Sequence, residues 1–224
     1  MKPKYYLSLF FLITILSCNA DKSTSMKAGD NTEKDTVKVT KFKTIIFFGN
    51  SLTAGYGLEP SEAFPALIQN KLDSLKLNYK VVNAGVSGET TSGGNSRVDW
   101  ILRQPIDVFV LELGANDGLR GIPLKETKNN LQSMINKVTI AYPNAKIILA
   151  GMQIPPNMGM QYTTEFRNIY PELAKKNNIT LIPFILEGVG GEAKLNQEDG
   201  IHPTAEGHKV IAENLWKEIQ DQLH

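Results

Sequence analysis

Cysteine is almost absent from this chain. Cys18 is the only one in 224 residues, so no disulfide can form within the molecule. Histidine is also scarce: only His202, His208 and His224 occur, and they lack the His-x-x-x-His spacing of a zinc site. These shortages predict that the protein uses no metal. Neither sign of charge dominates, because the formal net charge is +1 and the basic residues are scattered, so nucleic-acid binding is not expected.

Several motifs of nucleotide binding and catalysis are missing as well. The segment Gly55-Tyr56-Gly57 begins like a dinucleotide-binding loop, but Pro60 stands where the third glycine belongs. The sequence contains no Gly-Lys-Ser/Thr of a phosphate loop. The Gly-x-Ser-x-Gly elbow is absent because Thr53 follows Leu52, which argues against the usual α/β-hydrolases.

The first 18 residues have the pattern of an export signal. Lys2 and Lys4 precede an apolar stretch from Tyr5 to Leu16, which is too short for an ordinary membrane-spanning helix and ends in Ser17-Cys18. The position of Cys18 resembles that of a bacterial lipoprotein, in which this cysteine carries the lipid anchor. The alternative is an ordinary cleaved leader with an incidental cysteine.

Residues 19–41 are rich in Lys, Thr, Ser, Asp and Asn and are predicted to form a flexible polar tether. As a coil of about 23 residues, it would span on the order of 25 to 30 Å. Residues 42–224 are then long enough for one compact domain, which we expect to act as a monomer. Together these features predict a bacterial lipoprotein held on a membrane, facing the periplasm or the cell surface.

Apolar patterning in residues 42–224 alternates between two kinds of segment. Short apolar runs predict strands at residues 44–48, 80–83, 106–113, 146–150 and 180–183. Helical spacing predicts helices within residues 64–75, 131–138, 166–173 and 211–219, with His208 as a solvated residue of the last. Residues 90–103 fit a helix less well because Gly93 and Gly94 interrupt them. This alternation indicates a doubly wound, parallel α/β sheet, in which ligands bind at the carboxyl ends of the strands.

Chemistry-bearing residues follow three of these strands. Ser51 comes after the first, Gly88 after the second and Asn116 after the third, while Asp199-x-x-His202 lies near the end of the chain. A serine, a late Asp-x-x-His pair and segments able to present a backbone N–H and an amide are the parts of an acyl-transfer site. The residues therefore predict a serine hydrolase.

Each part also has a purely structural interpretation. The Gly49-Asn50-Ser51 segment after the first strand could be a plain turn. Gly88 could supply a positive φ, and Asn116-Asp117 could cap a helix. Asp199-Gly200 is a common turn pair, and His202 could cap the last helix before Pro203. The coincidence of all the parts is less expected than any one of them.

The four segments resemble the conserved blocks of the GDSL or SGNH hydrolases, with Ser51, Gly88, Asn116 and His202 at the four positions of the SGNH name. Similarity to the bacterial thioesterase, arylesterase and lysophospholipase branch extends over nearly the whole domain. It includes the sequences VNA before SGET, GANDGLRG, PPNMGMQY, YPELA and DGIHP. The family usually has aspartate where this chain has Asn50.

The resemblance implies a three-layer α/β/α sandwich with a mainly five-stranded parallel sheet, a flavodoxin-like arrangement. It also implies that Ser51 is the nucleophile, His202 the base and Asp199 its partner, with the oxyanion held by Ser51, Gly88 and Asn116. No cofactor is expected. Three further residues, Leu119, Met152 and Ile154, are expected to line an apolar acyl channel, unless they are ordinary packing residues.

The leading hypothesis is an esterase or thioesterase that acts on acyl esters, such as aryl esters, lysophospholipids or acyl thioesters. One alternative is an esterase that removes O-acetyl groups from carbohydrates, since the same architecture serves sugar esters. Another is a non-catalytic binding lipoprotein on the same scaffold, although the complete set of site residues argues against it.

Overall fold

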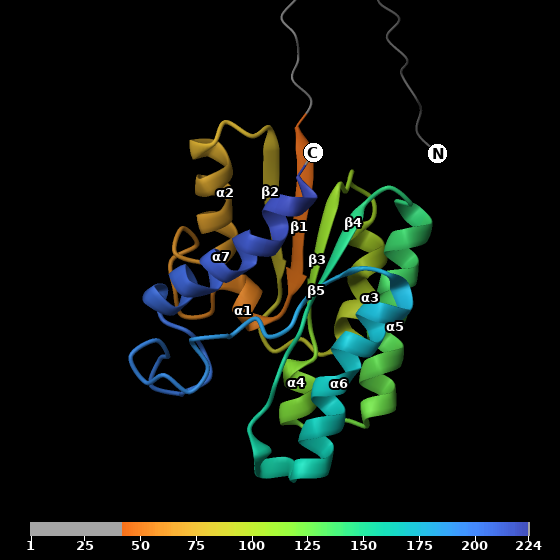
Figure 1. Ribbon diagram of the computed structural model, residues 1–224, viewed down its shortest axis with the longest axis vertical. Helices are drawn as coiled ribbons and strands as arrows, with labels where there is room; N and C mark the ends of the chain where they lie inside the picture. Colours follow the sequence, from red (N-terminus) through yellow and green to blue (C-terminus); the bar gives the residue numbers. More distant parts are fainter. Residues whose placement is uncertain (1–41, 224) are drawn as a thin grey trace, which may run out of the picture. The chain divides into compact units, whose positions relative to one another are not determined.

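The computed structural model describes residues 42–223 (Figure 1). The predicted export signal, Cys18 and tether lie outside the described residues. Five parallel strands form one sheet, in the order β2-β1-β3-β4-β5. The strands are β1 (Lys43–Gly49), β2 (Tyr79–Gly85), β3 (Val108–Glu112), β4 (Lys146–Ala150) and β5 (Thr180–Ile182). All five lie where the apolar runs predicted them, and the predicted α/β class is confirmed.

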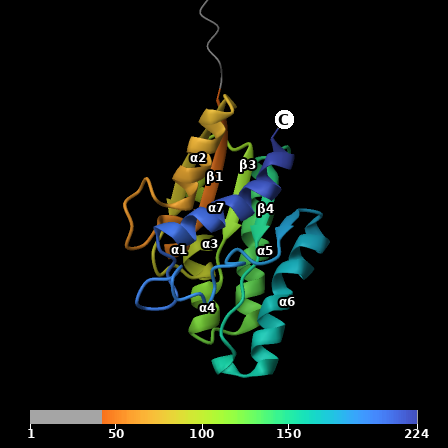
Figure 2. The same ribbon diagram turned by 60° about the vertical axis from the view of Figure 1, so that its left-hand side comes forward.

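Helices cover both faces of this sheet (Figure 2). On one side α2 packs against α7, and on the other α3 packs against α5, which in turn contacts α6. The helices are α1 (Ser51–Ala54), α2 (Phe64–Ser74), α3 (Thr91–Ile101), α4 (Ala115–Leu119), α5 (Leu124–Ala141), α6 (Met160–Asn177) and α7 (Ala205–Ile219), with short 3-10 turns η1 (Pro156–Met158) and η2 (Gln220–Gln222). Among residues 42–223, no helix combines the length and hydropathy that crossing a membrane requires.

Helix α3 contains two glycines, and the packing of the helix requires one of them, Gly94. A Cβ atom on Gly94 would lie 2.3 Å from Leu113 Cδ1 and 3.2 Å from the Phe48 ring, so only glycine lets the helix lie this close to the sheet. At the N-terminus of α3, the Thr90 side chain accepts a hydrogen bond from the Gly93 N–H. The close approach of α3 explains a glycine pair that the sequence pattern treats as an interruption.

His208 corrects the prediction made for it. It does lie on the last helix, α7, but its side chain is 1% exposed rather than solvated. Its Nδ1 accepts a hydrogen bond from the Phe64 N–H at 3.0 Å, and its ring stacks on that of Phe64. Burial lowers the pKa of His208 to about 4, so the neutral ring joins α7 to α2.

The order of the strands determines where a ligand binds. From β1 the chain adds β2 on one side of the sheet and then crosses to add β3 on the other side of β1. In parallel sheets a crevice opens at the carboxyl ends of the two neighbouring strands where the order switches in this way. Ser51 follows β1 and Asn116 follows β3, so α1 and α4 start on the two sides of this point (Figure 1).

Candidate active site

The turn between β1 and α1 carries Ser51. Asn50 is the N-cap of α1, and its Oδ1 accepts a hydrogen bond from the Leu52 N–H at 2.9 Å. Behind this turn, Asn50 Nδ2 donates to Glu112 Oε1 at 2.7 Å. Ser51 is the first residue of the helix, so its own N–H has no intrahelical acceptor, and the residue lines a cavity.

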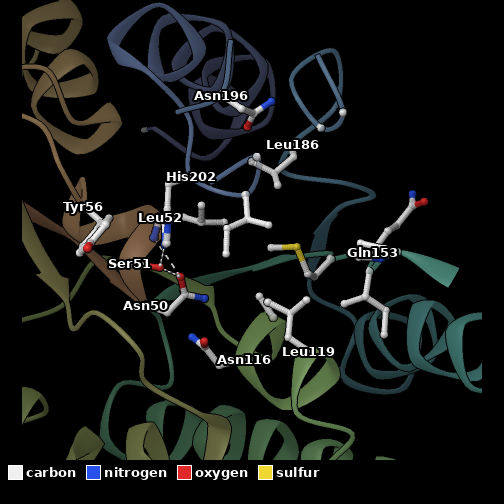
Figure 3. Close-up of a pocket in the computed structure, with 18 of the residues that line it drawn as sticks. Asn50, Ser51, Leu52, Tyr56, Asn116, Leu119, Gln153, Leu186, Asn196 and His202 are labelled. Carbon is white, nitrogen blue, oxygen red and sulfur yellow. Dashed lines mark hydrogen bonds between the residues drawn. The ribbon is translucent and has the colours of Figure 1, made fainter. Parts of the chain in front are cut away.

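Ser51, His202 and Asp199 form a continuous hydrogen-bonded chain (Figure 3). His202 Nε2 lies 2.9 Å from Ser51 Oγ, and His202 Nδ1 lies 2.6 Å from Asp199 Oδ2. Ser51 Oγ has a second acceptor in Asn50 Oδ1, but at 3.4 Å this is the more distant. The structure thus brings together three side chains from opposite ends of the domain.

Asp199 is held as a charged acceptor. Its Oδ1 accepts the N–H groups of Ile201 and His202, each at 3.0 Å, while its Oδ2 faces the imidazole. Hydrogen bonding, first from the His202 side chain and then from these two N–H groups, lowers the pKa of Asp199 to about 2. The carboxylate is therefore ionised throughout the neutral range. Tyr56 packs on His202, and the centroids of the two rings lie 4.5 Å apart.

Gly88 and Asn116 lie beside Ser51 in the same cavity. Gly88 has φ +77°, and within residues 42–223 no hydrogen bond engages its N–H. Asn116 Nδ2 donates to the Glu89 carbonyl at 3.0 Å, which fixes the amide next to the Gly88 loop. The Glu89 carboxylate is held in turn by Arg97, whose Nε and Nη2 each approach it to 2.6 Å. The site therefore offers polar donors on the side of Ser51 away from the histidine.

The purely structural interpretations hold for some of these residues and fail for others. Gly88 and Gly200 do have positive φ, and Asp199-Gly200 does form a turn. Gly114 is the N-cap of α4, and Asn116 lies within that helix, so Asn116 is not a cap. The cap of α7 is Thr204, whose hydroxyl accepts the Gly207 N–H, so His202 does not cap that helix. The turn geometry is thus compatible with the hydrogen-bonded chain.

Comparisons with known proteins agree with this arrangement. Residues 47–210 match the model of the GDSL-like Lipase/Acylhydrolase family. The chain belongs to this family. It is 38% identical to Esterase TesA of Pseudomonas aeruginosa over 182 residues, which cover 81% of this chain and 90% of that protein. It is likewise 38% identical to the Escherichia coli K12 protein named Thioesterase 1/protease 1/lysophospholipase L1, over 83% of this chain and 87% of the relative.

A solved structure supports both the fold and the class of this GDSL-family chain. The esterase EstA from Pseudoalteromonas, solved as a form inhibited by monoethylphosphonate, is 34% identical with a TM-score of 0.77. The match covers 81% of this chain and 98% of EstA. The chain is thus a carboxylic ester hydrolase, and the non-catalytic alternative is set aside.

The cavity of this esterase has a volume of about 400 Å³ and extends from Ser51 and His202 along an apolar wall. The three residues expected in an acyl channel, Leu119, Met152 and Ile154, all line it. Met152 and Ile154 are almost fully buried within this wall, whereas Leu119 is 40% exposed. The cavity is consistent with an apolar ligand group bound next to the serine.

Sequence reasoning missed part of this wall. Phe184 and Ile201 also line the cavity. So do Leu186 and Tyr56, which Figure 3 labels. Most of these residues come from the loop between β5 and α7, which has neither helical nor strand periodicity to mark one face as buried. The only signal in the sequence was the apolar character of Phe184, Leu186 and Ile201 themselves.

Proposed function

We propose that this esterase hydrolyses acyl esters through Ser51, His202 and Asp199. Ser51 Oγ attacks the acyl carbonyl while His202 Nε2 takes its proton, and the same nitrogen returns that proton to the leaving group. Water then repeats the sequence to free the acid and regenerate Ser51. The 2.9 Å and 2.6 Å contacts of His202 with Ser51 and Asp199 carry this proposal.

The oxyanion would be stabilised by the N–H groups of Ser51 and Gly88 and by the Asn116 amide. Three observations support these roles: the N-terminal position of Ser51 in α1, the absence of a partner for the Gly88 N–H within residues 42–223, and the fixed Asn116 side chain. Donors held in place before the reaction stabilise the charge that develops in the transition state.

The substrate that fits this site is an ester of an apolar acyl chain. Apolar side chains, including Leu119, Leu186 and Ile201, dominate the cavity next to the serine. The related proteins named esterase, thioesterase and lysophospholipase support the same class of substrate. Leu119, Met152 and Ile154 would contact the acyl chain, whose burial contributes roughly 0.8 kcal/mol per CH₂ group.

A panel of p-nitrophenyl esters of increasing acyl length tests this assignment, with acetylated xylan as the carbohydrate ester. We expect kcat/KM to rise from acetate to medium chains, because each added CH₂ group leaves water for the apolar wall. Leu119→Ser should flatten this rise while leaving the hydrolysis of acetate little changed. Hydrolysis of the carbohydrate ester alone would instead favour the O-acetyl esterase.

We further propose that the domain is anchored to a bacterial membrane through lipid on Cys18. The support is the order of Lys2, Lys4, the apolar stretch, Cys18 and the polar residues 19–41 in the sequence. More than one lipid chain is needed for stable attachment, as each contributes about 0.8 kcal/mol per buried CH₂ group. An exported enzyme would not meet acyl-CoA, so esters or lysophospholipids outside the cytoplasm are the better physiological candidates.

Fractionation of bacteria that express the full-length protein tests the anchor. We expect wild type in the membrane fraction, and Cys18→Ser either released into the soluble fraction or left as an uncleaved precursor. The esterase activity of the two forms in detergent should be equal, because residue 18 precedes the hydrolase domain. A soluble wild-type protein with a mature N-terminus other than Cys18 would contradict the anchor and leave the esterase assignment unchanged.

A further inference from the structure

A buried polar cluster joins the end of β3 to residues 50–53, the turn that carries Ser51 and is called the nucleophile turn below. The cluster takes no part in the mechanism described above. It consists of Asn50, Thr53 and Glu112, none of which is more than 1% exposed. Glu112 is the last residue of β3, and Asn50 and Thr53 flank Ser51 in sequence. A carboxyl group buried this deeply is costly unless hydrogen bonds compensate for its lost hydration.

The hydrogen bonds to the Glu112 carboxylate all come from the nucleophile turn. Its Oε1 accepts from Asn50 Nδ2 at 2.7 Å, and its Oε2 accepts from the Asn50 N–H at 3.2 Å and from Thr53 Oγ1 at 2.8 Å. The orientation of the Asn50 amide is determined by the Leu52 N–H, which requires Oδ1 on its side. Nδ2 must therefore face Glu112, so both Glu112 oxygens act as acceptors.

We propose that Glu112 is a positioning residue that holds the Ser51 turn only in its ionised form, and that Asn50 supplies the donor that the ionised form requires. The inference rests on the proposed role of Ser51 as the nucleophile. If Glu112 binds a proton, a proton on Oε1 faces the donor Asn50 Nδ2, and a proton on Oε2 faces the Asn50 N–H and the Thr53 hydroxyl. The Thr53 hydroxyl can accept that proton only by ceasing to donate to Oε2. One polar hydrogen of the cluster is then left without an acceptor, and the bonds that hold Ser51 against His202 must rearrange.

The surroundings of Glu112 bring its protonation close to neutral pH. Burial raises the pKa of Glu112 to about 7, against the lowering effect of the bonds from Thr53 and Asn50. Other ionisable groups nearby are already engaged. The Tyr170 hydroxyl on α6 donates to the Leu113 carbonyl, Asp117 on α4 accepts from Thr91, and Arg97 on α3 pairs with Glu89. None of them bonds to the Glu112 carboxylate.

Paired substitutions can reverse the direction of one hydrogen bond. In Glu112→Gln an NH₂ group replaces one carboxylate oxygen and must face either Asn50 Nδ2 or the Asn50 N–H. Both of these groups are donors, so one contact is lost. Adding Asn50→Asp gives that amide a carboxylate acceptor and restores a complete set of hydrogen bonds, and the Leu52 N–H still has its acceptor.

Asn50→Asp alone places two carboxyl groups at the 2.7 Å contact, so they must share a proton. This single variant should be active at neutral pH and lose activity at alkaline pH, where the shared proton is released.

Steady-state kinetics with a p-nitrophenyl ester test the proposal. At pH 8, Glu112→Gln should lower kcat by about 10- to 100-fold with little change in KM, the effect of one unsatisfied buried donor. The double variant should recover most of that loss. On the acid side, log kcat/KM of the wild type should approach a slope of 2, because His202 and Glu112 must both lose a proton. In Glu112→Gln the slope should be 1.

Thr53 provides a matched control. Thr53→Val removes one donor without changing the shape of the side chain, so it should raise the pKa of Glu112 and move the acid limb to higher pH. Thr53→Ser keeps the donor and should not move the limb. Equal shifts in both variants would contradict the proposal.

The other outcomes of these experiments also either support or overturn the proposed role of Glu112. A double variant no better than Glu112→Gln, in activity or in thermal unfolding, overturns the proposal, as does a wild-type slope of 1. If Glu112→Gln does not fold, a folded and active double variant still supports the reversed bond, and an unfolded one overturns it. Loss of activity in Ser51→Ala separates these results from failure of the proposed function, which would leave that variant active.

Discussion

Ser51→Ala and His202→Ala should each lower kcat/KM by about 10⁴- to 10⁶-fold, and the double variant should be little worse than either single one. The reason is that the two side chains act as a unit: without the 2.9 Å contact to His202 Nε2, Ser51 Oγ has no base, and without Ser51 the base has nothing to activate. Each single substitution therefore removes the whole of the nucleophilic pathway.

Kinetics and covalent labelling measure this prediction together. A fluorophosphonate probe should label the wild type and not Ser51→Ala, while circular dichroism should show that all variants are folded. The matched control is His208→Asn, which keeps an acceptor for the Phe64 N–H in α2 and leaves the site intact, so labelling should persist. Independent losses that multiply in the double variant would mean that the two residues do not act as a unit. Residual turnover in all three variants reflects the oxyanion donors and binding, which remain in place.

Most of the sheet could be predicted because its strands are buried on both faces. Ile45 to Phe48 are completely buried, and such a strand reads as a continuous apolar run. Helix α3 was harder to predict from the sequence. A glycine is needed at position 94 because Leu113 and Phe48 lie close to it, and both residues are distant in sequence. Propensity describes a residue alone, whereas this glycine is selected by a contact between layers.

The candidate site divides in the same way. The spacing of Asp199 and His202 allows a local contact within one turn, so the sequence could predict their pairing. The contact of His202 with Ser51 spans 151 positions and followed only from the parallel topology and the family resemblance. Glu112 could not be predicted as part of the site, because it looks like the polar end of an apolar strand until the fold places Asn50 and Thr53 against it.

Asp199→Asn should lower kcat/KM by about 10⁴-fold, a larger loss than Asp199→Ala. Two backbone N–H groups, from Ile201 and His202, point at Asp199 Oδ1 and would hold the oxygen of the new amide on their side. The NH₂ group would then face His202 Nδ1 at the position where Asp199 Oδ2 now accepts. Because this NH₂ donates, it forces the imidazole proton onto Nε2, and that nitrogen can no longer accept the proton of Ser51.

Asp199→Ala separates the tautomer from the charge. It removes the carboxylate but imposes no tautomer, and the Asp199 side chain is 40% exposed, so water can reach His202 Nδ1 and accept its proton. Catalysis should therefore fall less than in Asp199→Asn, although the larger side chain is the closer match in shape. The nitrogen-15 spectrum of the imidazole checks the cause directly: protonation should lie at Nδ1 in the wild type and at Nε2 in Asp199→Asn. A greater loss in Asp199→Ala, with Nδ1 protonated in both variants, would show that Asp199 acts through its charge alone.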